Sequence, residues 1–211
     1  MLKVCESFIS IQGESTFAGL PCAFVRLSGC NLRCTYCDTP YARDEGDERN
    51  VDELADEIAE SGVGLVEVTG GEPLLQQDTP RLCSRLLERG LTVLVETNGT
   101  RDISVLPDTV VRIMDIKTPG SGQQEQFLED NLDYLRPTDE CKLVICNRTD
   151  FDWARDLVRS HDLAARCTVI LSPASGELSP DRLAEWILAE RLPVRLGLQL
   201  HKVIWGDERG R

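Results

Sequence analysis

The chain has 211 residues, of which 28% are charged and 41% are hydrophobic, and its formal net charge at pH 7 is −13. This length suits one domain with a substantial core, and we expect a single domain over residues 1–211. The acidic balance argues against nonspecific binding of nucleic acid and against anionic membranes. No apolar run approaches membrane-spanning length, so we expect a soluble protein.

Nine cysteines are a high count for this length, and the number is odd. No secretory leader precedes them, and the pattern fits reduced thiols in the cytoplasm better than a disulfide scaffold. Six of the cysteines are scattered over apolar runs. They are Cys5, Cys22, Cys83, Cys141, Cys146 and Cys167.

The chain begins with two predicted strands, at 2–10 and 22–28, separated by a polar turn at 11–15 that carries a glycine. Arg26 interrupts the second strand. Because burying an unpaired charge costs several kcal/mol, we expect Arg26 either to pair with Glu14 or to present its planar guanidinium to a ligand carboxylate.

Three cysteines follow the second strand, Cys30, Cys34 and Cys37. Thiolates favour iron–sulfur clusters, zinc and cuprous copper. A closed zinc or cubane site takes four protein ligands, whereas this loop supplies three and no Cys or His lies nearby in sequence. A four-iron cubane held here would keep one iron open to a non-protein ligand. The alternatives are a zinc knuckle with a remote fourth ligand, a disulfide pair, or three buried thiols.

Helices and strands alternate after the cysteine loop. Residues 43–49 read as a charged linker, and Asn50 is predicted to cap a helix with Glu53 at the capping-box position. Further helices are predicted at 78–88, 123–130 and from Asp150 as the cap to Arg159, and another begins at Ser179-Pro180. The remaining strands are predicted at 65–69, 92–96, 110–114, 141–146, 167–171 and 194–200.

This alternation predicts right-handed βαβ units and a parallel sheet. A complete eight-unit barrel takes about 250 residues, and this chain is shorter. We therefore expect an α/β fold, a partial, splayed TIM-like barrel of about six βα units with an N-terminal cluster-binding loop.

Polar or glycine-bearing residues follow several predicted strands, where α/β folds place their active sites. Gly70-Gly71-Glu72 is either a tight turn or a segment that approaches a ligand closely. Asp115 and Lys117 are either a strand-end ion pair or ligand contacts. His201, predicted at the end of the last strand, is either structural or active in ligand contact or proton handling. The other strand ends are 96–99 and 172–173.

The three-cysteine loop with Tyr36 before its third cysteine, followed by Gly70-Gly71-Glu72-Pro73, resembles the radical S-adenosylmethionine (SAM) superfamily. The resemblance implies that Cys30, Cys34 and Cys37 hold a [4Fe–4S] cluster, whose open iron is chelated by the amino and carboxylate groups of SAM. It also implies a set of SAM contacts. These are Tyr36, Gly70, Gly71, Glu72, Thr97, Asp115, Lys117, Ser121 and Ser172.

The whole chain resembles one family within that superfamily, the 7-carboxy-7-deazaguanine synthases of queuosine and deazapurine biosynthesis. The resemblance implies conversion of 6-carboxy-5,6,7,8-tetrahydropterin to 7-carboxy-7-deazaguanine and ammonia. A 5′-deoxyadenosyl radical would take a hydrogen atom from C6, the ring would contract, and SAM would be regenerated. The segments that carry it are Gln12-Gly13-Glu14, the Arg26 strand, Cys34 to Thr39, Thr69 to Pro73, Glu96 to Gly99 and Leu200-His201-Lys202.

The family resemblance further implies Mg²⁺ bound by Thr39, a homodimer, and an external one-electron reductant such as flavodoxin. The terminal carboxylate of Arg211 is expected near the substrate if the tail folds back. The implied substrate contacts are Ile11, Gln12, Gly13, Glu14, Arg26, Thr69, His201 and Arg211.

Two other functions fit part of the pattern. A glycyl-radical activase would use the same cluster and SAM on a protein partner, which requires a wide-open site. A noncatalytic zinc-binding module would hold zinc instead of iron and would not cleave SAM.

Overall fold

A computed structural model describes all residues, 1–211. Nine strands form a single open sheet in the order β3-β1-β2-β4-β5-β6-β7-β8-β9. From β2 to β9 all neighbours are parallel, whereas β1 pairs antiparallel with both β2 and β3. The strands are β1 (Leu2–Ile11), β2 (Pro21–Leu27), β3 (Asp47–Arg49), β4 (Leu65–Gly70), β5 (Thr92–Thr97), β6 (Val111–Asp115), β7 (Glu140–Ile145), β8 (Thr168–Pro173) and β9 (Arg195–Leu196).

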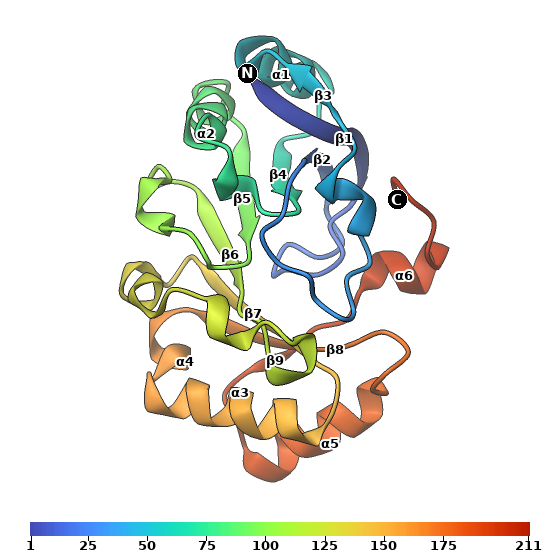
Figure 1. The fold of residues 1–211 in the computed structure, drawn as a ribbon, viewed down its shortest axis with the longest axis vertical. Helices are drawn as coiled ribbons and strands as arrows, with labels where there is room; N and C mark the ends of the chain where they lie inside the picture. The colour runs from blue at the N-terminus through green and yellow to red at the C-terminus, as the bar shows by residue number, and fades with distance from the viewer.

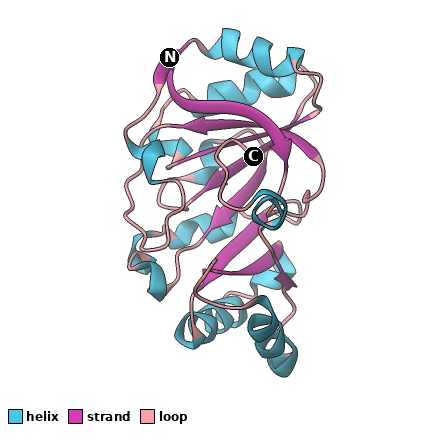
Figure 2. Cartoon of the chain, turned by 90° about the vertical axis from the view of Figure 1, so that its right-hand side faces the viewer, coloured by secondary structure: helices cyan, strands magenta, loops and turns pink.

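Helices α1 to α5 lie on the outer face of this curved sheet, whereas the short helix α6 lies apart from them, beside the C-terminus (Figures 1 and 2). The two ends of the sheet, β3 and β9, do not pair, so the arrangement confirms the expected partial barrel. No helix has the length and apolar character needed to cross a membrane. The α-helices are α1 (Val51–Glu60), α2 (Thr79–Glu88), α3 (Arg148–Ser160), α4 (Leu163–Arg166), α5 (Pro180–Glu190) and α6 (Leu200–Trp205).

Strand β4 shows how the sequence separates core from site. Val66 and Val68 belong to the core cluster that α1 and α2 cover, whereas Glu67 and Thr69 line the cavity on the other face. This alternation follows from the two-residue period of a strand. A second core cluster lies between β7, β8 and helices α3 and α5.

The helix signals were mostly confirmed. The Asn50 side chain caps α1 by accepting from the backbone N–H groups of Asp52 and Glu53. Proline stands in the first turn of α5, as expected.

The predicted cap of α3 was wrong. Asn147 is the N-cap and accepts from Asp150 N at 3.1 Å, while the Asp150 carboxylate is buried and accepts from Gly120 N at 2.7 Å. Its other oxygen accepts from Cys146 N at 2.9 Å, so Asp150 joins a neighbouring loop to the residues just before α3.

The chain departs from the sequence prediction at three other places, the linker at 43–49, the helical piece at 123–130 and the last strand. The linker at 43–49 contains the short edge strand β3, which pairs with β1. The helical piece predicted at 123–130 consists of two 3₁₀ turns, Gln124–Gln126 and Glu129–Tyr134.

The last predicted strand, 194–200, is confined to the two residues of β9. Gly197 lies so close to β8 that a Cβ there would sit 2.5 Å from Ile170 Cγ2. Leu200 N then bonds to Gly13 O at 2.9 Å, and the chain enters α6. His201 is therefore on a helix and not at a strand end.

Candidate active site

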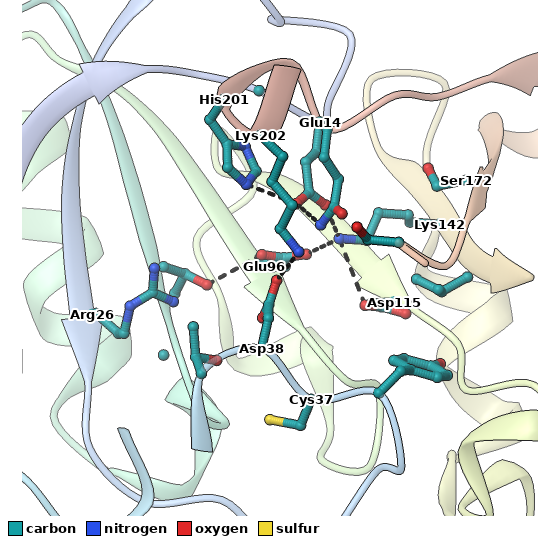
Figure 3. Close-up of a pocket in the computed structure, with 18 of the residues that line it drawn as sticks. Glu14, Arg26, Cys37, Asp38, Glu96, Asp115, Lys142, Ser172, His201 and Lys202 are labelled. Atoms are coloured by element: carbon teal, nitrogen blue, oxygen red, sulfur yellow. Dashed lines mark hydrogen bonds and ion pairs between the residues drawn. The ribbon is translucent and has the colours of Figure 1, made fainter. Parts of the chain in front are cut away.

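One cavity of about 630 Å³ opens at the carboxyl ends of the parallel strands. Figure 3 shows its side chains converging from strands, the cysteine loop and α6. Two residues named from the sequence, Glu72 and Ser121, do not line it. The ones that do are Ile11, Gln12, Gly13, Glu14, Arg26, Cys30, Cys34, Tyr36, Cys37, Thr39, Thr69, Gly70, Gly71, Thr97, Asp115, Lys117, Ser172, His201 and Arg211.

The three loop cysteines are half-buried free thiols at one side of the cavity. The backbone N–H of Leu32 donates to Cys30 Sγ at 3.4 Å, and Asn98 Nδ2 lies 4.0 Å from the same sulfur. Burial raises the pKa of the Cys34 thiol, although the nearby Lys117 acts in the opposite direction. Since metal ligands are thiolates, ligation at Cys34 must release a proton.

These residues fit a cluster better than a single ion. A zinc site gathers four ligands at about 2.0–2.3 Å from one metal. The loop brings three thiols to the cavity wall, one fewer than a closed zinc site requires. A cubane carries its irons at separate corners, so its thiolates do not share one metal. The loop therefore fits a [4Fe–4S] cluster with three protein ligands.

Gly70 and Gly71 bring the end of β4 against the cysteine loop. Gly70 has φ of 150°, and a Cβ there would collide with the Leu27 backbone. A Cβ on Gly71 would collide with Gly29 O and would lie 2.6 Å from Cys30 Cβ. Both positions thus require glycine, and the exposed backbone of this segment faces the cavity beside the cysteines.

The Glu72 carboxylate is turned away from the cavity and is fully buried. It accepts hydrogen bonds from Leu74 N at 2.9 Å, Thr97 Oγ1 at 2.8 Å and Asn98 N at 2.6 Å. Burial raises its pKa, and these three donors oppose the rise. Glu72 thereby joins the carboxyl ends of β4 and β5 and positions Gly70-Gly71 from behind.

Ser121 also acts behind the cavity wall. Its hydroxyl donates to Thr118 O at 2.6 Å, and its carbonyl accepts from Thr35 N at 3.2 Å. Ser121 therefore anchors the cysteine loop and does not reach the cavity itself.

Unsatisfied polar atoms mark the wall between the cysteine loop and β6. Lys117 Nζ donates to Asp115 Oδ2 at 2.8 Å and lies 5.7 Å from the centre of the Tyr36 ring. Asp115 Oδ1 and the Tyr36 hydroxyl are buried without a hydrogen-bond partner. Buried polar atoms normally find partners, so this wall fits a bound molecule that supplies hydroxyl or amino groups.

Lys142 is the main functional residue that the sequence analysis missed. Its side chain, 5% exposed, contacts Glu14 Oε2 at 2.6 Å and Glu96, with Asp115 Oδ2 at 3.6 Å (Figure 3). Burial opposes ionisation at these positions, yet Lys142 lowers the pKa of Glu14 to about 2. The signal was present, because Lys142 interrupts an apolar strand as Arg26 does.

Arg26 pairs with Glu6 and not with Glu14. Its Nε donates to Glu6 Oε1 at 2.8 Å, and Tyr41 donates its hydroxyl to the same oxygen at 3.0 Å. The two terminal nitrogens of the guanidinium have no hydrogen-bond partner within the chain. They remain available to a carboxylate in the cavity.

The Gln-Gly-Glu turn forms the floor of the site with α6. Gln12 Nε2 donates to Glu67 Oε2 at 2.6 Å, and burial together with Glu96 raises the pKa of Glu67 to about 8. A Cβ on Gly13 would collide with the His201 ring. His201 Nε2 also lies 3.9 Å from Glu14 Oε1. The turn and α6 therefore pack directly against each other.

Comparison with known proteins agrees with this geometry. Residues 24–116 match the Radical SAM superfamily. A 7-carboxy-7-deazaguanine synthase of Chlorobaculum tepidum is 45% identical, covering 99% of this chain and 97% of that protein. One from Koribacter versatilis is 43% identical, with 98% of each covered.

A solved structure shows the same fold. The crystal structure of QueE from Escherichia coli superposes with a TM-score of 0.76 at 24% identity, covering 95% of this chain and 94% of that one. Because these relatives are 43–45% identical to it over nearly its full length, the chain belongs to the 7-carboxy-7-deazaguanine synthase family of the radical SAM superfamily.

Proposed function

We propose that this chain is a radical SAM lyase that converts 6-carboxy-5,6,7,8-tetrahydropterin to 7-carboxy-7-deazaguanine and ammonia. The observation that carries the proposal is a three-cysteine loop opening into the same cavity as the free guanidinium edge of Arg26. The reaction is redox-neutral, because one nitrogen leaves as ammonia and the hydrogen count is conserved. SAM can therefore be regenerated in each turnover.

The cluster and SAM, when bound, supply the one-electron chemistry that removes a hydrogen atom from the substrate. The chain's own task is to hold the reacting groups close together. Cys30, Cys34 and Cys37 hold the cluster, and the Gly70-Gly71 backbone offers its polar groups to the methionyl part of SAM.

The rest of SAM has a wall of side chains to contact. Asp115 Oδ1 is a free acceptor for a ribose hydroxyl or an amino group. Tyr36, Thr97, Lys117 and Ser172 complete this wall, while Glu72 and Ser121 support it from behind.

The opposite half of the cavity suits an anionic heterocycle. The terminal nitrogens of Arg26 bind the substrate carboxylate as a fork. Ile11, Gln12, Gly13, Glu14, Thr69, His201 and Arg211 lie around the remaining space and contact the pterin.

A magnesium ion fits beside the substrate carboxylate. The Thr39 hydroxyl lines the cavity and makes no cap hydrogen bond to its own 3₁₀ turn. Mg²⁺ is commonly held by few protein ligands together with waters and substrate oxygens. We therefore assign Thr39 as its ligand from the chain.

Small-molecule chemistry is favoured over activation of a protein partner. Helix α6 and the residues after it contribute to the cavity wall, so the site is not wide open. The nine free cysteines suit the cytoplasm, where an external reductant such as flavodoxin delivers the electron.

A homodimer is supported by exposed apolar side chains on β9, on α6 and on the connection between them. They are Leu196, Leu198, Val203 and Ile204. Such patches commonly mark interfaces. Light scattering of the purified protein, repeated with Val203→Glu, tests this assignment, and a monomeric wild type would contradict it.

Anaerobic incubation of the reconstituted protein with SAM, dithionite and 6-carboxytetrahydropterin tests the function. Mass spectrometry should detect 7-carboxy-7-deazaguanine, with SAM not consumed in proportion to product. Cleavage of SAM without any deazaguanine would remove the proposed substrate and leave the superfamily assignment intact.

A further inference from the structure

We propose that Arg209 is a positioning residue that fastens residues 206–211 across the cavity and, through Glu6, fixes the orientation of the substrate-binding Arg26. The inference rests on the proposed function for the role of Arg26. It adds to that function a closing device at the mouth of the site.

Arg209 is the only residue after Gly206 with polar contacts outside this segment. Its Nε donates to Glu6 Oε2 at 2.9 Å, and its Nη2 donates to Glu45 Oε2 at 2.9 Å. Nη2 also lies 3.7 Å from Cys5 Sγ. The only other side-chain hydrogen bond after Gly206 joins Arg211 to Glu208 within the segment itself.

The Arg209 guanidinium also stacks on an aromatic ring. It lies 3.8 Å from the centre of Tyr41, close enough for a cation–π interaction. Tyr41 in turn donates to Glu6, so ring and carboxylate together form one receptor for the guanidinium. A planar fork suits this arrangement better than an ammonium group does.

Glu6 connects the tail to the substrate site. One of its oxygens accepts from Arg209 and the other accepts from Arg26 and Tyr41. The Glu6 side chain is only 14% exposed, so the pairing is better shielded than an ordinary surface ion pair. Burial alone would raise the pKa of Glu6, but these three donors lower it and keep the carboxylate ionised.

The segment held by Arg209 forms part of the cavity wall. Asp207, Glu208, Gly210 and Arg211 all line it, and in Figure 1 the C-terminus lies beside β1 and β2. Residues 206–211 therefore border the space in which we place the substrate. Arg209 is the single side chain that holds this wall to the rest of the protein, so its replacement should release residues 206–211.

The test compares Arg209→Ala and Arg209→Lys with Arg182→Ala, a control at an exposed pair on α5. The first readout is chymotrypsin cleavage after Trp205 in the reconstituted protein. We expect about tenfold faster cleavage in Arg209→Ala, an intermediate rate in Arg209→Lys, and the wild-type rate in the control. Equal cleavage rates in all four proteins would refute the proposal that Arg209 fastens residues 206–211, whatever reaction the protein performs.

The second readout separates positioning from stability. In Arg209→Ala we expect KM for the pterin to rise about tenfold with a smaller change in kcat. We also expect more 5′-deoxyadenosine per deazaguanine formed, because an open site lets the reaction abort. An unchanged KM and product ratio would show that the tail does not act on Arg26. If wild-type protein makes no deazaguanine, the proposed function fails. The cleavage rates still show whether Arg209 holds residues 206–211.

Discussion

The cysteine loop, residues 29–39, and the tail, residues 206–211, border the same cavity but are held in different ways. The loop is tied to four other segments by backbone and side-chain hydrogen bonds, whereas the tail is tied through one arginine. The loop's bonds are Gly29 N to Ala42 O, Glu72 N to Gly29 O, Asn31 Nδ2 to Thr100 Oγ1, Thr35 N to Ser121 O and Thr35 Oγ1 to Gly120 O.

This difference matches what each side must do. A cluster has to remain in one geometry through many turnovers, so its loop is fixed at several points. A substrate has to enter and leave, so the wall beside it is held weakly. Lys142 and its carboxylate partners Glu14, Glu96 and Asp115 line the same cavity and form a separate ion-pair cluster.

The largest effect is expected on the fixed side. Cys34→Ala should abolish cluster assembly and SAM cleavage, because no neighbouring thiol can replace the lost ligand. Cys83→Ala, in the core between α2 and the sheet, is the matched control and should retain iron. Iron content and SAM cleavage measure both, and turnover by Cys34→Ala would refute the ligand assignment.

The second largest effect is expected from the ion-pair cluster around Lys142. Lys142→Met leaves Glu14 and Glu96 close together without their cation, while Asp115 keeps Lys117. We therefore expect a loss of stability on the order of 3 kcal/mol and loss of turnover. Chemical denaturation at pH 7 measures the first effect. Lys3→Met, which removes an exposed contact to Asp44 O, should change stability little.

The pH dependence of this loss has a definite sign. The pKa of Glu14 falls from 4.5 to about 2 on folding, so its contribution is present above pH 4.5 and is lost as pH falls toward 2. The destabilisation by Lys142→Met should therefore shrink between pH 4.5 and pH 3. A loss that grows on acidification would contradict the pairing.

On the substrate side a smaller, selective effect is expected. Arg26→Ala should leave iron content unchanged and raise KM for the pterin by about 10- to 100-fold, the equivalent of one charge-assisted fork. Arg85→Ala, at an exposed ion pair on α2, is the control. Normal pterin affinity in Arg26→Ala would return Arg26 to a purely structural role with Glu6.

The smallest effect concerns the floor of the cavity. The pKa of Glu67 rises from 4.5 to about 8 on folding, so the stability it favours at low pH is lost as pH rises from 4.5 to 8. Glu67→Gln removes this loss and keeps an acceptor for Gln12. We expect it to stabilise the apoprotein more at pH 8.5 than at pH 5 in chemical denaturation, and an equal effect at both values would refute the shift.

Much of the fold, and the cysteine loop with the Gly70-Gly71 segment beside it, could be predicted from the sequence. Local signals sufficed there, because the cysteine spacing, the Gly70-Gly71 pair and the alternation in β4 each depend on neighbouring residues. The roles of Glu72 and Ser121 did not follow, since both lie next to ligand-facing residues and only the fold turns them inward.

The tail and the middle of the cavity were harder to predict because their contacts link distant parts of the chain. Lys142 meets Glu14 across 128 positions, and Arg209 meets Glu6 across 203. Helix α6 was missed because the alternation in residues 194–200 predicts a strand that would end where the helix begins. Its position is set by contact with Gly13, which no local pattern reveals.

The central claim is that three cysteines hold a cluster with one iron open to SAM. Anaerobic reconstitution followed by iron and sulfide analysis, with electron paramagnetic resonance of the reduced protein before and after SAM, tests it most directly. We predict about four irons and four sulfides per chain and a spectrum that changes when SAM binds. Zinc in place of iron, or a cluster spectrum indifferent to SAM because a fourth side chain fills the open position, would contradict it.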